Sequence, residues 1–147
     1  MYDQILVPYD GTEEAEKSAR HGIELAAALD AGVHGLYVID LPGAPRALAL
    51  RDDEEQMREE YREYGEQTLS ELEAIADEHG VEFTSAMRTG SVAEEIVDYA
   101  DDEGLDAIVI GTAYRGTIGN LIGGTTDKVV RTATVPVITK RMQFDEV

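Results

Sequence analysis

Short apolar runs alternate with amphipathic segments along the whole chain. Five runs have the length and the flanking turn residues that are typical of buried strands, at residues 4–9, 33–40, 81–88, 106–111 and 135–140. Between the runs, apolar residues recur every three or four positions, which indicates amphipathic helices at residues 13–29, 53–79, 91–100 and 126–133. The pattern therefore predicts a strand followed by a helix four times over, and then a fifth strand.

This order predicts an α/β fold. Strands that alternate with helices pair in parallel through right-handed crossovers. The strands have the pattern of apolar runs and not of strict alternation, as expected when helices cover both faces of the sheet. We expect one domain over residues 1–147, a doubly wound three-layer sandwich with a five-stranded parallel sheet. Ligands of such folds bind outside the carboxyl ends of the strands, where the strand order reverses.

Two helix starts carry recognisable capping residues. Thr12 precedes the first amphipathic segment and is followed by two glutamates, so it is the expected N-cap of that helix. Ser91 and Glu94 have the spacing of a capping box at the start of the third helix.

Size and composition restrict the class of protein. The chain has 147 residues and a mass of 16.0 kDa, which suits one globular domain. It has no cysteine, which excludes disulfides and thiolate chemistry. No apolar run is long enough to span a membrane, and the N-terminus enters a strand-like run without a signal-peptide pattern. We therefore expect a cytoplasmic protein that does not associate with membranes.

The formal net charge is −19. Such a surface repels phosphate backbones and anionic lipids, so binding to nucleic acid is not expected. Two interpretations of the acidity are open. It could be an ordinary solvated acidic surface, or an adaptation to a salt-rich, halophilic cytoplasm in which screening removes most of the repulsion. The size of the excess and the scarcity of lysine favour the second interpretation.

The segment at residues 111–126, "GTAYRGTIGNLIGGTT", departs from this acidity. It holds five of the 14 glycines and lies between a predicted strand and a predicted helix. Residues 111–141 together carry about +4 by formal count, in a chain of net charge −19. The segment could cradle an anion, or it could be a glycine-rich crossover with no ligand.

Three stretches resemble the universal stress protein family: "ILVPYDGTEEAEKSARHGIELA", "GSVAEEIVDYADDEGLDAIVIGT", and the C-terminal stretch from "DAIVIGT" to "VPVITKR". The resemblance covers essentially the whole chain. It implies a flavodoxin-like fold with strand order 3-2-1-4-5, and dimerisation through the last strand. It also implies a role in survival under stress, ATP as a ligand in one branch of the family, and little or no turnover.

The nucleotide-binding branch has the pattern Gly, two residues, Gly, nine residues, Gly, then Ser or Thr. Counted forward from Gly111, the second glycine falls on Tyr114 and the last pair on Gly124 and Thr125. Counted back from the following helix, the last glycine is Gly123, and Gly124 takes the place of the hydroxyl residue. In both registers Tyr114 replaces a glycine, which departs from the family pattern.

Phosphate binding at this segment would follow from elementary chemistry. Backbone N–H groups that converge at a helix N-terminus hold phosphate oxygens, and glycine lets the backbone approach closely. Arg115 could add a charged contact. The phosphate-binding candidates are Gly111, Gly123, Gly124, Thr125 and Thr126.

The resemblance also implies contributions from the ends of the first two strands. Asp10 would lie beside the adenine and ribose, Pro8 and Tyr9 would line the same crevice, and Val38 would touch the base. The residues alone support simpler alternatives. Asp10 precedes a glycine, as in a turn that caps a helix, and Val38 could be a core residue.

Motifs for other chemistries are absent. The chain has neither a P-loop nor the dinucleotide-binding G-x-G-x-x-G fingerprint. Its three histidines lack metal-ligand spacing, and no nucleophile stands with an evident base, so we assign no catalytic and no metal residues. Two functions remain: a stress protein that binds ATP, with Mg²⁺ alongside, or a non-binding dimeric interaction module. A weak ATPase or phosphotransferase is a third, less favoured reading.

The last predicted strand favours a homodimer through residues 134–142. It would lie at the sheet edge in the implied order, and an apolar edge invites pairing with a second copy about a two-fold axis. One set of alternating side chains would face the protein's own helices and the other would lie near the edge. Pro136 cannot donate to a ladder and would blunt part of that edge.

Overall fold

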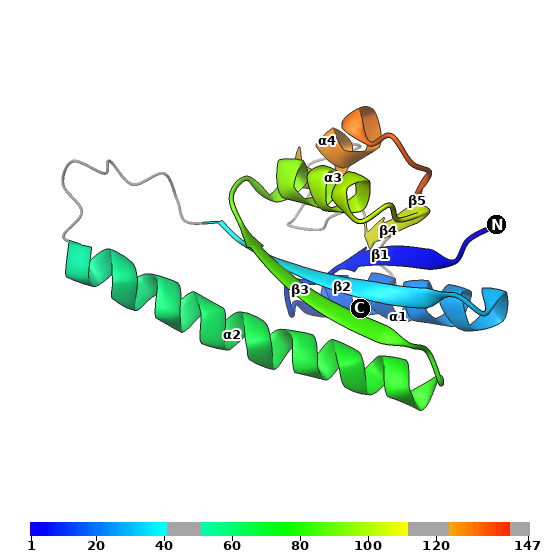
Figure 1. Ribbon diagram of the computed structural model, residues 1–147, viewed down its shortest axis with the longest axis horizontal. Helices are drawn as coiled ribbons and strands as arrows, with labels where there is room; N and C mark the ends of the chain where they lie inside the picture. Colours follow the sequence, from blue (N-terminus) through cyan, green and yellow to red (C-terminus); the bar gives the residue numbers. More distant parts are fainter. Residues whose placement is uncertain (41–50, 112–123, 142–147) are drawn as a thin grey trace.

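The structure, a computed structural model, describes residues 1–40, 51–111 and 124–141. Its elements follow the order predicted from the sequence (Figure 1). The strands are β1 Gln4–Pro8, β2 Gly32–Ile39, β3 Phe83–Thr89, β4 Ala107–Gly111 and β5 Val137–Lys140. The helices are α1 Glu13–Leu29, α2 Arg51–Glu78, α3 Val92–Asp102 and α4 Gly124–Thr132.

The five strands form one parallel sheet in the order β3-β2-β1-β4-β5. This confirms the expected α/β class, the three layers, the flavodoxin-like topology and the strand order. Strand β1 pairs with β2 on one side and with β4 on the other, so the order reverses between β1 and β4. The carboxyl ends of these two strands are where this fold places a ligand.

The core divides between the two faces of the sheet, because successive side chains of a strand point to opposite faces. On one face, Ile5 and Val7 of β1 pack with Ile23 of α1 and Leu72 of α2. On the other face, Leu6 packs with apolar residues of α3 and α4 such as Ile96 and Val129. Helices α1 and α2 thus form one outer layer, and α3 and α4 form the other (Figure 1).

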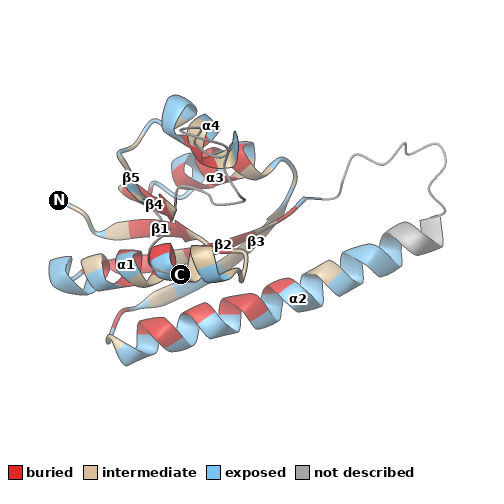
Figure 2. Cartoon of the chain, turned by 180° about the vertical axis from the view of Figure 1, so that it is seen from behind, coloured by how far each residue is buried: buried red, intermediate tan, exposed pale blue. Residues whose placement is uncertain are grey.

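Helix α2 is half inside the fold and half outside it. Its C-terminal half buries Leu69, Leu72 and Ile75 against the sheet, whereas Met57 and Tyr64 nearer its start are exposed. Figure 2 shows the buried residues confined to the half that lies along the sheet.

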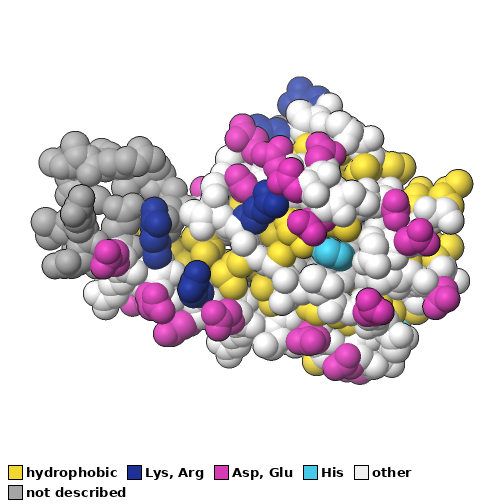
Figure 3. All heavy atoms as spheres, in the orientation of Figure 1, with side chains coloured by type: hydrophobic (Ala, Val, Ile, Leu, Met, Phe, Trp, Pro, Cys, Tyr) yellow, Lys and Arg dark blue, Asp and Glu magenta, His cyan; other side chains and the backbone are white. Residues whose placement is uncertain are grey.

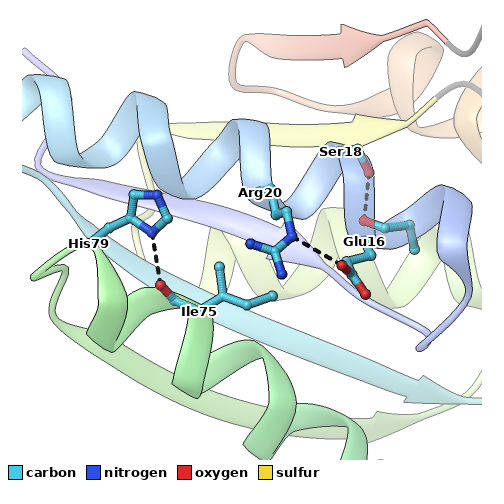
Figure 4. Close-up of polar contacts among 6 residues, drawn as sticks. Glu16, Ser18, Arg20, Ile75 and His79 are labelled. Carbon is cyan, nitrogen blue, oxygen red and sulfur yellow. Dashed lines mark hydrogen bonds and ion pairs between the residues drawn. The ribbon is translucent and has the colours of Figure 1, made fainter. Parts of the chain in front are cut away.

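His79 directly follows the last residue of α2, and the His79 Nδ1–H donates to the carbonyl of Ile75 at 3.0 Å (Figure 4). None of the helices in the described ranges is long and apolar enough to cross a membrane.

The two predicted helix caps differ in outcome. The Thr12 Oγ1 accepts a hydrogen bond from the Ala15 N–H at 3.2 Å, which confirms it as the N-cap of α1. Ser91 occupies the N-cap position of α3, but its side chain makes no capping hydrogen bond, so the predicted capping box is wrong. The next carboxylate, Glu95, lies against Gly90 and pairs with Arg88 at 3.7 Å.

Candidate functional site

The loop that follows β1 forms a tight turn built by Asp10. The Asp10 Oδ1 accepts hydrogen bonds from the Thr12 N–H at 3.0 Å and the Thr12 hydroxyl at 2.7 Å. Gly11 between them has φ = 86°, a conformation that favours glycine. These contacts give Asp10 the turn role that the residues alone suggested, and they hold the capping residue Thr12 in place. Its contact with a nucleotide stays a prediction.

Helix α2 closes over this turn. The Tyr64 hydroxyl donates to the Asp10 carbonyl at 3.4 Å, and Tyr64 packs edge-on against Tyr37. A Cβ at Gly11 would lie 2.8 Å from the Tyr64 hydroxyl and 3.3 Å from the Thr68 hydroxyl. Sequence reasoning missed Tyr64 and Thr68, because no local pattern links them to a turn more than 50 residues earlier. The turn is therefore held by contacts with α2 as well as by the hydrogen bonds between Asp10 and Thr12.

Pro8 and Tyr9 point to opposite faces of the sheet. Pro8 has the same parity as Leu6 and so faces the α3 and α4 layer, where half-buried Val38 also packs. Tyr9 is only 3% exposed and lies in the core beneath α1 and α2. Burial, aided by Glu16, raises the pKa of Tyr9 to about 12, so its hydroxyl stays protonated. Pro8 and Val38 can share a crevice, whereas Tyr9 can border it only through its backbone.

The end of β4 is fixed to the start of α4. The Thr126 hydroxyl donates a 2.7 Å hydrogen bond to the Gly111 carbonyl, and Thr126 is 1% exposed. That hydroxyl is thus committed to the fold, and the part of Thr126 that could face a phosphate is its backbone N–H. The contact positions the first turn of α4 beside the carboxyl end of the sheet.

Gly111 packs closely against α1. A Cβ at this position would meet the Ser18 Oγ at 3.0 Å and the Ser18 Cβ at 3.2 Å. Ser18 is itself buried, and its hydroxyl donates to the Ala15 carbonyl at 3.0 Å (Figure 4). A serine among the small residues of an amphipathic face was the signal in the sequence for this contact. The close packing on Ser18 therefore explains why residue 111 is a glycine without reference to any ligand.

The N-terminus of α4 is not covered by the described part of the chain. Gly124 is the first residue of the helix, and a Cβ there would meet no atom of residues 1–40, 51–111 or 124–141 within 4 Å. Thr125 is half-buried beside it. The first-turn acid, Asp127, pairs with Arg131 at 2.7 Å, which offsets its charge. Helix N-termini carry unpaired N–H groups and partial positive charge, so this end can accept an anion.

Some of the predicted site residues cannot be placed. Gly123, Tyr114 and Arg115 lie outside the described residues, so the choice between the two motif registers stays a prediction. Helix α4 begins at Gly124, and Gly124 and Thr125 therefore stand in its first turn in either register. Within the described ranges, no group of three or more His, Asp or Glu side chains is close enough to hold a metal ion.

Comparison with known proteins extends these observations. The pattern of the universal stress protein family matches residues 1–141. A universal stress protein of Methanocaldococcus jannaschii is 32% identical over 94% of this chain and 81% of its own length. The universal stress protein of Archaeoglobus fulgidus, solved in complex with dAMP, is 28% identical, with a TM-score of 0.64 over 94% of this chain and 97% of its own.

A second solved structure resembles the chain more closely in shape. It is the M. jannaschii protein MJ0577, with a TM-score of 0.81, 25% identity, and coverage of 98% of this chain and 99% of its own. The matches run over nearly the whole length, and the strand order agrees with the fold that the resemblance implied. The chain belongs to the universal stress protein family.

Proposed function

We propose that this universal stress protein binds ATP or a related adenine nucleotide at the carboxyl ends of β1 and β4. The observation that carries the proposal is the Thr126–Gly111 hydrogen bond, which fixes an open helix N-terminus beside the point of strand reversal. Backbone amides at such a terminus bind phosphate without any side-chain charge. The dAMP complex of the A. fulgidus relative supports the same class of ligand.

Each part of the nucleotide would have its own contacts. The phosphates would accept hydrogen bonds from the N–H groups of residues 123–126. Pro8 and Val38, on the α3 and α4 face, would border the base. The Asp10 Oδ1 is occupied by Thr12, so the other carboxylate oxygen would accept from the ribose hydroxyls. Mg²⁺ would accompany ATP through the phosphates, since that ion is commonly held by phosphate oxygens and water.

We further propose binding without efficient turnover. Hydrolysis needs a group that positions or activates water near the phosphates. In the described first turn of α4, the Thr126 hydroxyl is bonded to the Gly111 carbonyl and the Asp127 carboxylate is paired with Arg131, so neither is placed as a general base. For weak ATPase activity, the group that positions or activates water would have to come from residues 112–123.

The cellular setting follows from the family and the composition. We propose a cytoplasmic protein of the stress response that forms a homodimer through the edge of β5. A second candidate function is a dimeric interaction module that binds no nucleotide, which Tyr114 in place of a motif glycine favours. The two candidate functions share the fold and the proposed dimer. They differ in whether the N-terminus of α4 binds a nucleotide.

Calorimetric titration with ATP, ADP and AMP separates the two candidates, and Gly124→Val tests the site. Valine at residue 124 would meet no atom of the described residues, so the described fold should persist, but the side chain would occupy the space of a phosphate. Thr132→Val, at the other end of α4, is the matched control. We expect binding by the unmodified protein and the control, and loss of binding in Gly124→Val. Unchanged affinity in Gly124→Val would exclude this helix end from the site, and no binding by the unmodified protein would favour the interaction module.

A further inference from the structure

Strand β3 is the outer strand of the sheet at the end away from β5 (Figure 1). The Glu82 carbonyl accepts from the Val33 N–H, and the Gly90 N–H donates to the Ile39 carbonyl, both at 2.9 Å. Backbone groups along a strand alternate between its two edges. Even-numbered residues from 82 to 90 therefore turn their N–H and C=O groups toward β2. Those of Ser85 and Met87 face outward.

A groove lies beside these two residues, between β3 and α2. Its volume is about 340 Å³. It is lined by Ser85, Ala86 and Met87 of β3 and by Glu66, Leu69, Ser70 and Glu73 of α2. Gly65 permits this close approach, since a Cβ there would lie 2.6 Å from the Tyr37 ring and 3.2 Å from the Met87 Cε. A strand added to β3 would thus place every second side chain over this groove.

The charges of the groove favour a segment with basic side chains. Both ionisable residues that line it, Glu66 and Glu73, are acidic and exposed. They are seven residues apart, about 10 Å along the helix axis. Lysines two residues apart on a strand are separated by about 7 Å, and their long side chains can span the difference. Apolar Leu69 and Met87 would cover the aliphatic parts of such side chains.

The same charges disfavour two other occupants. Two copies paired through β3 would bring four carboxylates together, from Glu66 and Glu73 of each copy, which repel one another. The C-terminal residues 143–147 carry two acids and no base, so they do not complement the groove either. A basic segment of another protein complements it in both charge and shape.

We propose that the edge of β3 binds an extended, lysine- or arginine-rich segment of a partner protein by strand addition. The backbone of the segment pairs with Ser85 and Met87, and its basic side chains lie between Glu66 and Glu73. Main-chain pairing supplies affinity in this mode of recognition, and the groove supplies the preference for basic residues. The site lies at the opposite edge of the sheet from β5, so a dimer through β5 leaves it accessible.

The test uses an acetylated and amidated heptapeptide in which lysine alternates with valine and threonine. A net charge of −19 attracts any cation, so site-specific binding has to be separated from general attraction. Glu66→Lys combined with Glu73→Lys reverses the charge of the groove. Glu24→Lys combined with Asp98→Lys makes the same change of charge at exposed positions on α1 and α3. We expect the groove variant to bind the peptide about tenfold more weakly than the control variant.

Amide hydrogen exchange of the unmodified protein gives a second readout that does not depend on a variant folding. The peptide should slow exchange at Ser85 and Met87, whereas the amides of residues 84, 86 and 88 are already bonded to β2. A peptide with glutamate in place of lysine should have no effect. Absence of peptide binding, equal weakening in both double variants, or binding without slowed exchange at Ser85 and Met87 would overturn the proposal.

Discussion

The hydroxyl of Thr126 and the carbonyl of Gly111 form a partly buried 2.7 Å hydrogen bond that joins the first turn of α4 to the end of β4. The phosphate-binding geometry proposed for α4 depends on this contact, since it sets where the helix N-terminus lies relative to the sheet. In the proposed site Thr126 would act on a nucleotide by positioning backbone amides, because its own hydroxyl is already bonded.

Replacement of Thr126 by valine keeps the shape of the side chain and removes the donor. The Gly111 carbonyl would lose this partner in a partly buried site, at a cost of about 0.5–1.5 kcal/mol. We expect thermal denaturation to show a midpoint lower by roughly 2–4 °C per kcal/mol for a domain of this size. Titration should also show weaker ATP binding.

Thr125→Val is the matched control for this change, because Thr125 is the half-buried neighbour in the same helical turn. It should leave the thermal midpoint nearly unchanged. Equal stability of both variants and the unmodified protein would show that the Thr126 hydrogen bond does not hold α4 in place.

We expect His34 to make the stability sensitive to pH. Its Nδ1 lies 2.8 Å from the Tyr99 hydroxyl, and the Arg88 guanidinium lies 5.0 Å from the centre of the Tyr99 ring. Burial lowers the pKa of His34 from its usual value of 6.5, against an opposing effect of Glu103. Burial also raises the pKa of Tyr99, whose protonated hydroxyl can donate to the neutral imidazole.

Because the folded state binds this proton less readily than the unfolded state, stability should fall as the pH drops below 6.5. His34→Gln cannot take up the proton and should weaken the dependence. Chemical denaturation of both proteins at a series of pH values on either side of 6.5 checks the effect. Parallel stability curves for the two proteins would contradict it.

Salt should stabilise the fold if the acidity is an adaptation to a salt-rich cytoplasm. Acidic side chains are spread over the face seen in Figure 3, and lysine and arginine form only small groups there. Screening of this repulsion should raise the thermal midpoint markedly between low salt and molar KCl. A midpoint that stays flat or falls with KCl would indicate an ordinary acidic surface.

The backbone of β5 presents its outer edge differently from what the sequence predicted, which bears on the proposed dimer. The Ile108 N–H donates to the Pro136 carbonyl at 2.9 Å, so Pro136 faces β4, and its missing N–H does not blunt the outer edge. By alternation, the N–H groups of Val137 and Thr139 face outward. Val137 packs against the α3 and α4 side of the core and Ile138 against the other side, so lysine at either position would also cost stability.

Thr139→Pro is the sharper test, since Thr139 is exposed and its N–H faces outward. We expect light scattering to show a dimer for the unmodified protein and a monomer for Thr139→Pro. Thr84 is also exposed but lies on the opposite edge strand, so Thr84→Val should remain dimeric. A monomer of the unmodified protein at all concentrations would exclude the proposed dimer.

The strands and helices of the described part could be predicted because each has a strong periodic signal. Buried runs such as β4 and amphipathic faces such as that of α1 are local patterns, and their boundaries agree to within a few residues. The strand order was inferred from resemblance, because no local pattern encodes which parallel strands become neighbours.

The site was less predictable, because its contacts join distant residues. The packing of Gly111 on Ser18 and of Tyr64 on Asp10 depends on how helices cross the sheet. In a sequence, a glycine at the end of a strand can indicate either contact with a ligand or close packing of two secondary-structure elements. The direction of Tyr9 into the α1 and α2 layer likewise requires knowing which face each helix covers.

Backbone NMR spectra recorded during a titration with ATP test the central claim most directly. The proposal predicts the largest shifts at Gly124, Thr125 and Thr126, with smaller ones at Asp10 and Val38. The amides of Ser85 and Met87, at the far edge of the sheet, should not respond. A spectrum that ATP leaves unchanged, or shifts confined to residues away from the carboxyl ends of β1 and β4, would contradict the account.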